Sequence, residues 1–127
     1  MPQDRATADE LLTGVTAFLR DEVLPQLGGA SAYKCRVAAN ILAIVQREFT
    51  LGDKADRAEL DGLQALLATE CAEDDLGAAL DTLNAELCAR IRSGTLDDRR
   101  AEVMAHVRRT VRDKLAIANP KYPALRE

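Results

Sequence analysis

The stretch from Ser31 to Phe49, SAYKCRVAANILAIVQREF, constrains the fold of this chain more than any other segment. Wound as an α-helix, it places apolar side chains over more than half of its circumference. The residues on this broad apolar surface are Val37, Ala38, Ile41, Leu42, Ile44, Val45 and Phe49. Helices that are apolar on most sides are normally buried, so we expect this one to lie at the centre of the fold, surrounded by other helices.

The composition favours an all-α protein with a single domain over residues 1–127. A chain of 127 residues fits one compact domain, because domains most often contain about 100 to 150 residues. Aromatic residues make up only 3% of the chain and tryptophan is absent, so the core must be aliphatic. Leucine and alanine favour helices, whereas the β-branched and aromatic residues typical of strands are scarce.

Capping and helix-breaking residues divide the chain into five predicted helices. Thr7 and Ser31 are suitable N-caps, and Gly52 and Gly94 are suitable C-caps. Pro25 should end the first helix near residues 24–27. The predicted helices span about 7–27, 31–51, 53–71, 76–93 and 97–118.

The short connections between these helices favour antiparallel neighbours. We therefore predict a five-helix up-and-down bundle with the second helix at its centre. The tail from Pro120, PKYPALRE, should run extended over the bundle, with Tyr122 as an anchor.

The third predicted helix has one apolar side and one acidic side. Its apolar residues recur every three or four positions, at Leu60, Leu63, Leu66, Leu67 and Cys71. We expect this stripe to be buried, and we expect Glu59, Asp61 and Glu70 to face solvent. The next helix carries acidic Asp75 at its start, which suits the positive end of the helix dipole.

Charge is distributed unevenly along the chain. Residues 1–89 carry 7 Lys and Arg against 16 Asp and Glu, a net charge of −9, whereas residues 90–127 carry 10 against 5, a net charge of +5. Opposite charges at the two ends can favour packing within the fold or self-association. The whole chain is acidic and no aromatic residues alternate with the arginines, so we do not expect nucleic-acid binding.

Two asparagines and two arginines form the candidate ligand site. Arg36, Asn40 and Arg47 lie on one narrow polar ridge of the second predicted helix. Asn84 falls in the apolar stripe of the fourth, where an unpaired buried amide costs about 1–3 kcal/mol. We expect Asn84 to bond with Asn40 or Arg36, either as a structural bond that fixes helix register or as part of a polar cleft. Such a cleft would suit a small anionic metabolite such as an acyl-CoA, a phosphate or a carboxylate.

The last predicted helix carries arginines on its outer side: Arg99, Arg100, Arg108, Arg109 and Arg112. This basic face is either simply solvated or docks against an acidic partner surface, for which the acidic part of a second copy is one candidate.

Motifs of the common enzyme classes are absent from the sequence, which contains no GxGxxG, GxxxxGK[ST], GxSxG or HExxH. His106 is the only histidine, and we expect it at the edge of its helix rather than in a catalytic role. Glu102 and His106 lack the Glu-x-x-His spacing of di-iron bundles. We therefore expect a protein that is not an enzyme and needs neither a metal nor a cofactor.

The sequence favours a cytoplasmic protein. It has no run of about 20 apolar residues, so we expect no membrane span. Acidic residues stand near the N-terminus, where a secretory signal would have an apolar core. Cys35, Cys71 and Cys88 are widely spaced without a CxxC pair, so we expect reduced, unpaired side chains.

Several runs of residues resemble a bacterial family catalogued as domain-of-unknown-function family 6285. These runs are Glu10–Leu12, Phe18–Pro25, Arg36–Asn40, Val45–Glu48, Leu83–Asn84, Leu87–Cys88, Ile91–Gly94 and Lys114–Pro120. The resemblance covers nearly the whole chain and implies a small cytosolic helical protein. It also implies genes beside those of aminoglycoside-phosphotransferase-like and acyl-CoA-dehydrogenase-like enzymes, and hence an accessory role. It implies no catalytic residue.

Two functions follow as expectations. The first is a non-catalytic helical accessory protein that binds a phosphotransferase-like or acyl-CoA-handling enzyme, and itself, through helix faces. The second is a binder of a small anionic metabolite in the cleft of Arg36, Asn40, Arg47 and Asn84.

Overall fold

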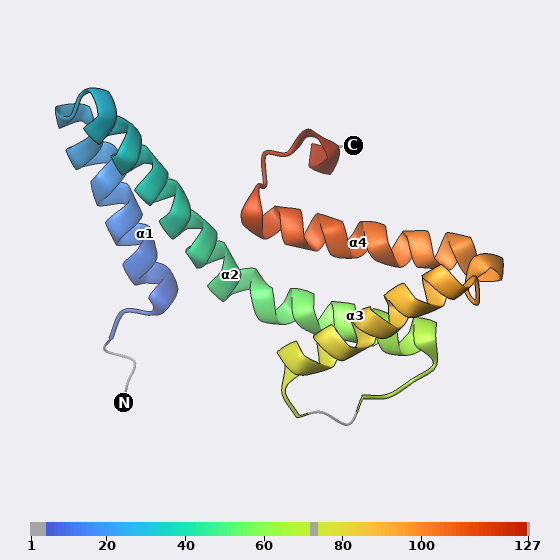
Figure 1. Cartoon of the computed structure of the whole chain (residues 1–127). Helices are drawn as coiled ribbons and strands as arrows, with labels where there is room; N and C mark the ends of the chain where they lie inside the picture. Colours follow the sequence, from blue (N-terminus) through green and yellow to red (C-terminus); the bar gives the residue numbers. More distant parts are fainter. Residues whose placement is uncertain (1–4, 72–73, 127) are drawn as a thin grey trace. The chain divides into compact units, whose positions relative to one another are not determined.

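The computed structural model describes residues 5–71 and 74–126 and is helical almost throughout them. The α-helices within these ranges are α1 (Ala8–Phe18), α2 (Gly29–Leu67), α3 (Leu76–Ser93) and α4 (Arg100–Ala118), shown in Figure 1. Short π or 3-10 turns accompany them: η2 (Leu19–Val23), η3 (Leu24–Gln26), η4 (Asp97–Arg99) and η5 (Pro123–Arg126). The predicted all-α class is confirmed, since no strand occurs in these ranges. None of the described helices is long and apolar enough to cross a bilayer.

The chain forms two compact units. Unit 1 comprises Met1–Gly52 and Ile117–Asn119, and unit 2 comprises Asp53–Ala116 and Pro120–Glu127. The first part of α2 therefore belongs to unit 1 and its last part to unit 2. The single domain over residues 1–127 stays a prediction, because two compact units can belong to one domain.

The prediction of five helices is wrong, because the second and third predicted helices are one. In the described chain there are four α-helices, and α2 continues for 39 residues through Gly52. No proline interrupts it, and a glycine inside a helix costs only about 1 kcal/mol relative to alanine, which the surrounding helix formers offset. Gly52 is therefore not a C-cap. A left-handed glycine does end α3, where Gly94 has φ of 81°.

The predicted helix starts are confirmed where a side chain caps the helix. The Glu10 backbone N–H donates to Thr7 Oγ1 at 3.2 Å, and the Ala78 backbone N–H donates to Asp75 Oδ2 at 3.1 Å. The prediction of Ser31 as an N-cap is wrong, because α2 begins at Gly29 and Ser31 lies within its first turn. The side chains of Thr7 and Asp75 each accept a hydrogen bond from an N–H group that has no partner within its own helix.

The end of the first helical segment also follows from the sequence. After α1 the chain continues through the wider π-helical turn η2 into η3, which carries Pro25 and ends at Gln26. Proline lacks an N–H group and its ring crowds the carbonyl one turn earlier, so a wider turn before it relieves both problems. Helical structure thus stops within the predicted range of residues 24–27.

In unit 1, α1 packs against the small residues of α2. The two helices lie side by side in Figure 1. Ala39 is completely buried, and the thiol of Cys35 lies 3.7 Å from the carbonyl oxygen of Leu19. Further along the same side of α2, the Gln46 amide donates to Asp9 Oδ1 at 2.8 Å and to Thr13 Oγ1 at 2.7 Å. Small side chains on this side allow close helix contact.

In the first part of α2, most of the large apolar side chains point away from α1 and are exposed. Ile41 is 53% exposed and Phe49 is 67% exposed. The prediction that this helix is sheathed by its neighbours is therefore wrong. The exposed large apolar residues of α1 and the first part of α2 are Leu11, Val15, Phe18, Tyr33, Val37, Ile41, Ile44, Val45, Phe49 and Leu51.

Unit 2 has an aliphatic core. Its buried residues are Leu63, Leu66, Leu67, Leu80, Leu83, Leu87, Leu96 and Val103. The predicted stripe of the third helix is confirmed, because its central leucines are buried and Leu60 and Cys71 pack partly buried against them. In unit 2 the apolar side chains of α2 therefore pack against residues of α3 and α4.

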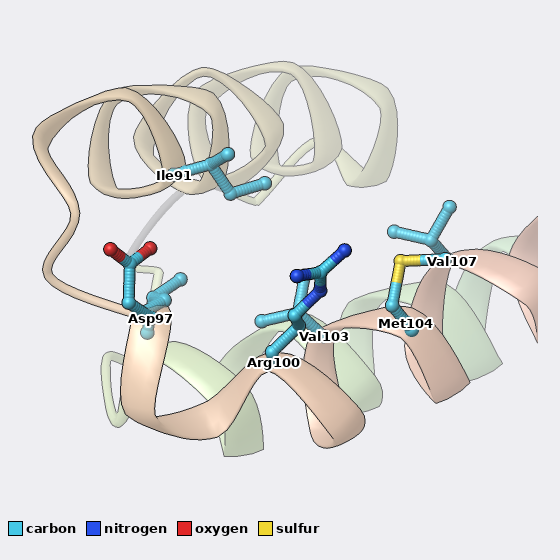
Figure 2. A pocket seen from close by; sticks show the side chains of 7 residues that line it. Ile91, Asp97, Arg100, Val103, Met104 and Val107 are labelled. Atoms are coloured by element: carbon cyan, nitrogen blue, oxygen red, sulfur yellow. The ribbon is translucent and has the colours of Figure 1, made fainter.

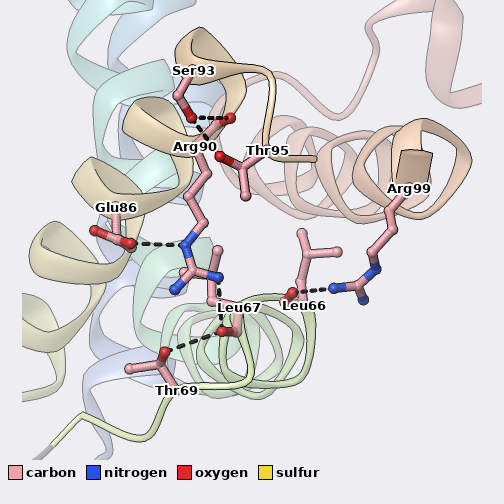
Figure 3. Close-up of polar contacts among 8 residues, drawn as sticks. All are labelled: Leu66, Leu67, Thr69, Glu86, Arg90, Ser93, Thr95 and Arg99. Atoms are coloured by element: carbon pink, nitrogen blue, oxygen red, sulfur yellow. Dashed lines mark hydrogen bonds and ion pairs between the residues drawn. The ribbon is translucent and has the colours of Figure 1, made fainter. Parts of the chain in front are cut away.

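Two arginines hold the end of α2 (Figure 3). Arg90 Nη1 donates to the carbonyl oxygen of Leu67 at 2.9 Å, and Arg99 Nη1 donates to that of Leu66 at 2.7 Å. The last carbonyl groups of a helix lack partners and carry its negative dipole, so two guanidinium groups satisfy both needs. The next residue, Ala68, turns the chain with φ of 50°.

The prediction of an extended tail is wrong over its described part. Residues Pro123–Arg126 form η5, because the Leu125 N–H donates to the Tyr122 carbonyl at 3.0 Å. Tyr122 is exposed and is not an anchor. Glu127 lies outside the described residues.

Replacing Gly52 by alanine tests the continuity of α2. In a helix interior, alanine should raise the free energy of unfolding by about 0.5–1 kcal/mol. The new methyl group would meet only Glu48, whose exposed carboxylate can rotate away. At a left-handed cap, as in Gly94→Ala, the same change should destabilise the fold. Chemical denaturation of both variants measures the difference; destabilisation by Gly52→Ala as large as that by Gly94→Ala would contradict a continuous helix.

Candidate functional site

A buried polar cluster centred on Glu59 lies beside the core of unit 2. Glu59 is only 7% exposed, so the prediction that it faces solvent is wrong. Its carboxylate is buried because α3 and α4 supply partners: Asn84 Nδ2 donates to Glu59 Oε1 at 3.0 Å, and Lys114 Nζ lies 3.7 Å from the same oxygen. One carboxylate oxygen thus joins three helices.

Asn84 has a partner, as its place in an apolar stripe requires, but the partner is Glu59 rather than Asn40 or Arg36. Asn40 Oδ1 instead accepts from Arg20 Nη2 at 2.9 Å in unit 1. Glu59 belongs to unit 2 with Asn84, whereas Asn40 and Arg36 belong to unit 1.

The remaining members of the predicted cleft have different surroundings. Arg47 Nε donates to the carbonyl oxygen of Ile117 at 2.7 Å, within unit 1. The Arg36 side chain is exposed. No hydrogen bond joins Arg36, Asn40 and Arg47, the members in unit 1, to one another among the described residues, and the ligand site of these residues with Asn84 stays a prediction.

His106 is buried beside the Glu59 cluster. Its side chain is 5% exposed, so the expectation of an edge position is wrong. Its Nδ1 atom lies 3.5 Å from Arg109 Nη2. The ring can reach this position because α2 has Gly62 there: a Cβ atom at Gly62 would lie 2.6 Å from His106 Nδ1. This glycine was not singled out by the sequence, whose periodicity gives no information on close helix contacts.

The surroundings of His106 favour its neutral form. Burial lowers the pKa of the imidazole, and the positive charge of Arg109 lowers this pKa further, whereas the charge of Glu59 opposes both effects. A neutral ring can accept a hydrogen bond from the guanidinium at one nitrogen. No group of three or more His, Cys, Asp or Glu side chains is arranged to hold a metal ion in the described part of the chain.

The arginines predicted to form one basic face have different roles. Arg99 is engaged within the chain, because it bonds to Leu66 and forms an ion pair of 2.6 Å with Glu102. Arg109 lies beside His106, and Arg100 lines a cavity. Arg100, Arg108, Arg109 and Arg112 are exposed, and the docking role of the five arginines stays a prediction.

An apolar cavity of about 280 Å³ lies between the end of α3 and the start of α4 (Figure 2). Its lining residues are Ile91, Leu96, Asp97, Arg100, Val103, Met104 and Val107. The side chains of Asp97 and Arg100 supply its charged groups. The cavity depends on the turn from Gly94 to η4, which sequence periodicity does not predict.

A second, polar pocket of about 320 Å³ lies in unit 1, between α1 and α2. It is lined by Thr13, Thr16, Ala17, Arg20, Asp21 and Gln46. The Thr16 hydroxyl is buried without a hydrogen-bond partner. The sequence did not single out these residues, because the polar ridge that it indicated lies on the second predicted helix alone.

The described chain is therefore an all-helical protein with a buried polar cluster, an apolar cavity and a largely exposed apolar helix surface. It belongs to the family described as a domain of unknown function, DUF6285, whose family model matches residues 25–122. The match confirms the family that the sequence resembles; it includes α2, α3 and α4 and leaves α1 outside. Neither a curated protein nor a solved structure shows significant similarity to this chain.

The His106 environment should make stability depend on pH. Because the pKa is lowered on folding from its usual value of 6.5, the unfolded chain binds more protons between the folded pKa and 6.5. The stabilisation by neutral His106 should be complete above about pH 6.5 and decline as the pH falls below it. NMR titration of the ring measures the pKa, and denaturation at several pH values measures the slope. Arg109→Gln should raise the pKa of His106 towards 6.5, because it removes a positive charge beside the ring. A wild-type imidazole that titrates at or above 6.5 would contradict this description.

Proposed function

We propose that this chain is a helical interaction protein that associates with a second copy of itself through one face of the hairpin formed by α1 and the first part of α2. The observation that carries the proposal is the exposure of large apolar side chains on both helices. Soluble monomers rarely expose contiguous apolar patches of more than a few hundred Å².

Part of the exposed apolar surface lies on the sides of α1 and α2 that are opposite their polar residues, and Tyr33, Val37, Ile44 and Leu51 are exposed elsewhere on α2. The hydrogen bond between Arg20 and Asn40 marks the polar side. At 100° per residue, the side of α1 opposite Arg20 carries Leu11, Val15 and Phe18. The side of α2 opposite Asn40 carries Ala38, Val45 and Phe49. We call these six residues, which lie away from the hydrogen bond between Arg20 and Asn40, the hairpin apolar face.

The size and shape of this face suit a second hairpin. Its large side chains, Leu11, Val15, Phe18, Val45 and Phe49, are 38–67% exposed, so they can contribute to the ~800 Å² that each partner buries in a standard interface. Two antiparallel helices can complete a four-helix bundle by pairing their exposed apolar residues with those of a copy.

Charge does not oppose this pairing. Residues 5–52 carry five Lys and Arg and five Asp and Glu, a net charge of zero, although the whole chain has −4. Two copies can therefore approach without net repulsion between their hairpins. The partner needs no complementary charge of its own, which favours self-association over an oppositely charged protein.

The wider role that we propose is accessory. It rests on the family resemblance, which implies a phosphotransferase-like or acyl-CoA-handling enzyme as the protein served by the dimer. The exposed Arg108 and Arg112 would be available to such a partner.

Binding of a small anionic metabolite is a second candidate function. The observation that favours it is the polar pocket of unit 1, where Arg20 lies near the buried, unpaired hydroxyl of Thr16. Arginine and hydroxyl donors suit a phosphate or carboxylate. A thermal-shift series with inorganic phosphate and simple carboxylates, compared between the wild type and Thr16→Val, distinguishes this function from self-association.

Light scattering after gel filtration tests self-association. The wild type should elute with twice the 13.8 kDa mass of one chain. Phe49→Glu should be monomeric, because it places a charge within the hairpin apolar face. Tyr33 is the matched control: it is 66% exposed, about as much as Phe49, but lies off this face, so Tyr33→Glu should remain dimeric.

A monomeric wild type would overturn the proposal, as would equal disruption by the two variants. A complex with another protein that needs Phe49, formed by an otherwise monomeric chain, would assign the face to that protein instead.

A further inference from the structure

The cavity of unit 2 combines an aliphatic wall with two charges at one edge. Leu96 and Val103 are buried in the core beneath it, and Met104 and Val107 continue the wall along α4. Figure 2 shows the carboxylate of Asp97 and the guanidinium of Arg100 on the side of the cavity that Ile91 faces. Such a site can hold a small molecule with an aliphatic part and a polar head.

Both charged groups are without partners. Within the described chain, neither the Asp97 side chain nor the Arg100 side chain makes a hydrogen bond or an ion pair. The adjacent Arg99, by contrast, is paired with Glu102. Charged groups beside an apolar wall are free here to bind a ligand.

The two charges are opposite, and this limits the ligand. A simple anion would pair with Arg100 but would be repelled by Asp97. A simple cation would pair with Asp97 but would be repelled by Arg100. A zwitterion satisfies both groups. Residues three apart at a helix start lie on the same side, so they can engage two neighbouring charged groups of one molecule.

We propose that this cavity binds an aliphatic α-amino acid, leucine being the reference ligand. Its carboxylate pairs with Arg100, its ammonium group pairs with Asp97, and its side chain contacts Leu96, Val103 and Met104. The volume of about 280 Å³ is below the ~300–1,000 Å³ typical of pockets for drug-sized ligands, which suits a metabolite of this size. The site does not depend on the hairpin apolar face.

Methyl NMR offers a direct test, because the chain has two methionines, Met1 and Met104. In full-length protein labelled at the methionine methyl groups, leucine should shift the Met104 signal and saturate, while the Met1 signal stays in place. Isothermal titration of the same sample gives the affinity. A Met104 signal that leucine does not move would overturn the proposal.

Ligand analogues separate the two charges. 4-Methylpentanoate lacks the ammonium group and 3-methylbutylamine lacks the carboxylate, so each should bind about tenfold more weakly than leucine or worse. If 4-methylpentanoate binds as well as leucine, the assignment of an amino acid is wrong.

Matched variants locate the contacts. Arg100→Gln and Asp97→Asn should each weaken leucine binding about tenfold, with the fold retained because neither side chain has a partner among residues 5–71 and 74–126. The controls are Arg92→Gln and Asp98→Asn, which change neighbouring residues of the same type outside the cavity lining. Equal weakening by variant and control would overturn the assigned contacts.

Discussion

Close contact between α1 and the small-residue side of α2 is the constraint on which the arrangement of unit 1 depends. Ala39 is fully buried there and the Cys35 thiol reaches the backbone of the preceding turn. Because these small side chains face α1, the large ones of the same helix must point away from it. Ile41 and Phe49 therefore remain exposed in a helix that is apolar around most of its surface.

The last part of the same helix is packed differently. In unit 2 the leucines of α2 are covered by α3 and α4, and a carboxylate on an adjacent side, Glu59, is buried with them. Burial of that charge is tolerable because Asn84 donates to it and Lys114 lies near it. The carbonyl groups at the end of α2 are likewise satisfied by arginines from outside the helix (Figure 3). Unit 2 thus covers the leucines of α2 and satisfies its last carbonyl groups, whereas in unit 1 Ile41 and Phe49 of the same helix remain exposed.

The sequence predicted those features of the fold that depend on neighbouring residues. The caps at Thr7, Asp75 and Gly94 were correct because each bond or backbone angle is set within one turn of helix. Gly52 was misread because a glycine is compatible with both a helix interior and a helix end, and the choice depends on the energy of the flanking residues.

The candidate site was harder to predict because it depends on contacts between helices. Periodicity showed that Asn84 needed a partner but could not show that the partner was Glu59 on the same unit. Periodicity predicted the broad apolar surface of α2, but it did not predict which side of α2 would pack against α1. The burial of His106 could not be predicted, because it depends on the missing side chain at Gly62, where the imidazole ring comes close to α2.

The central claim is that the hairpin apolar face is uncovered in one chain and becomes covered when two chains meet. The protein has two phenylalanines, Phe18 and Phe49, and both lie on this face. Fluorine NMR of fluorophenylalanine-labelled protein with a soluble paramagnetic agent measures their exposure directly across a dilution series. The account predicts that both signals are protected at high concentration and lose protection together on dilution. Protection that persists in the monomer, or exposure at every concentration, would contradict it.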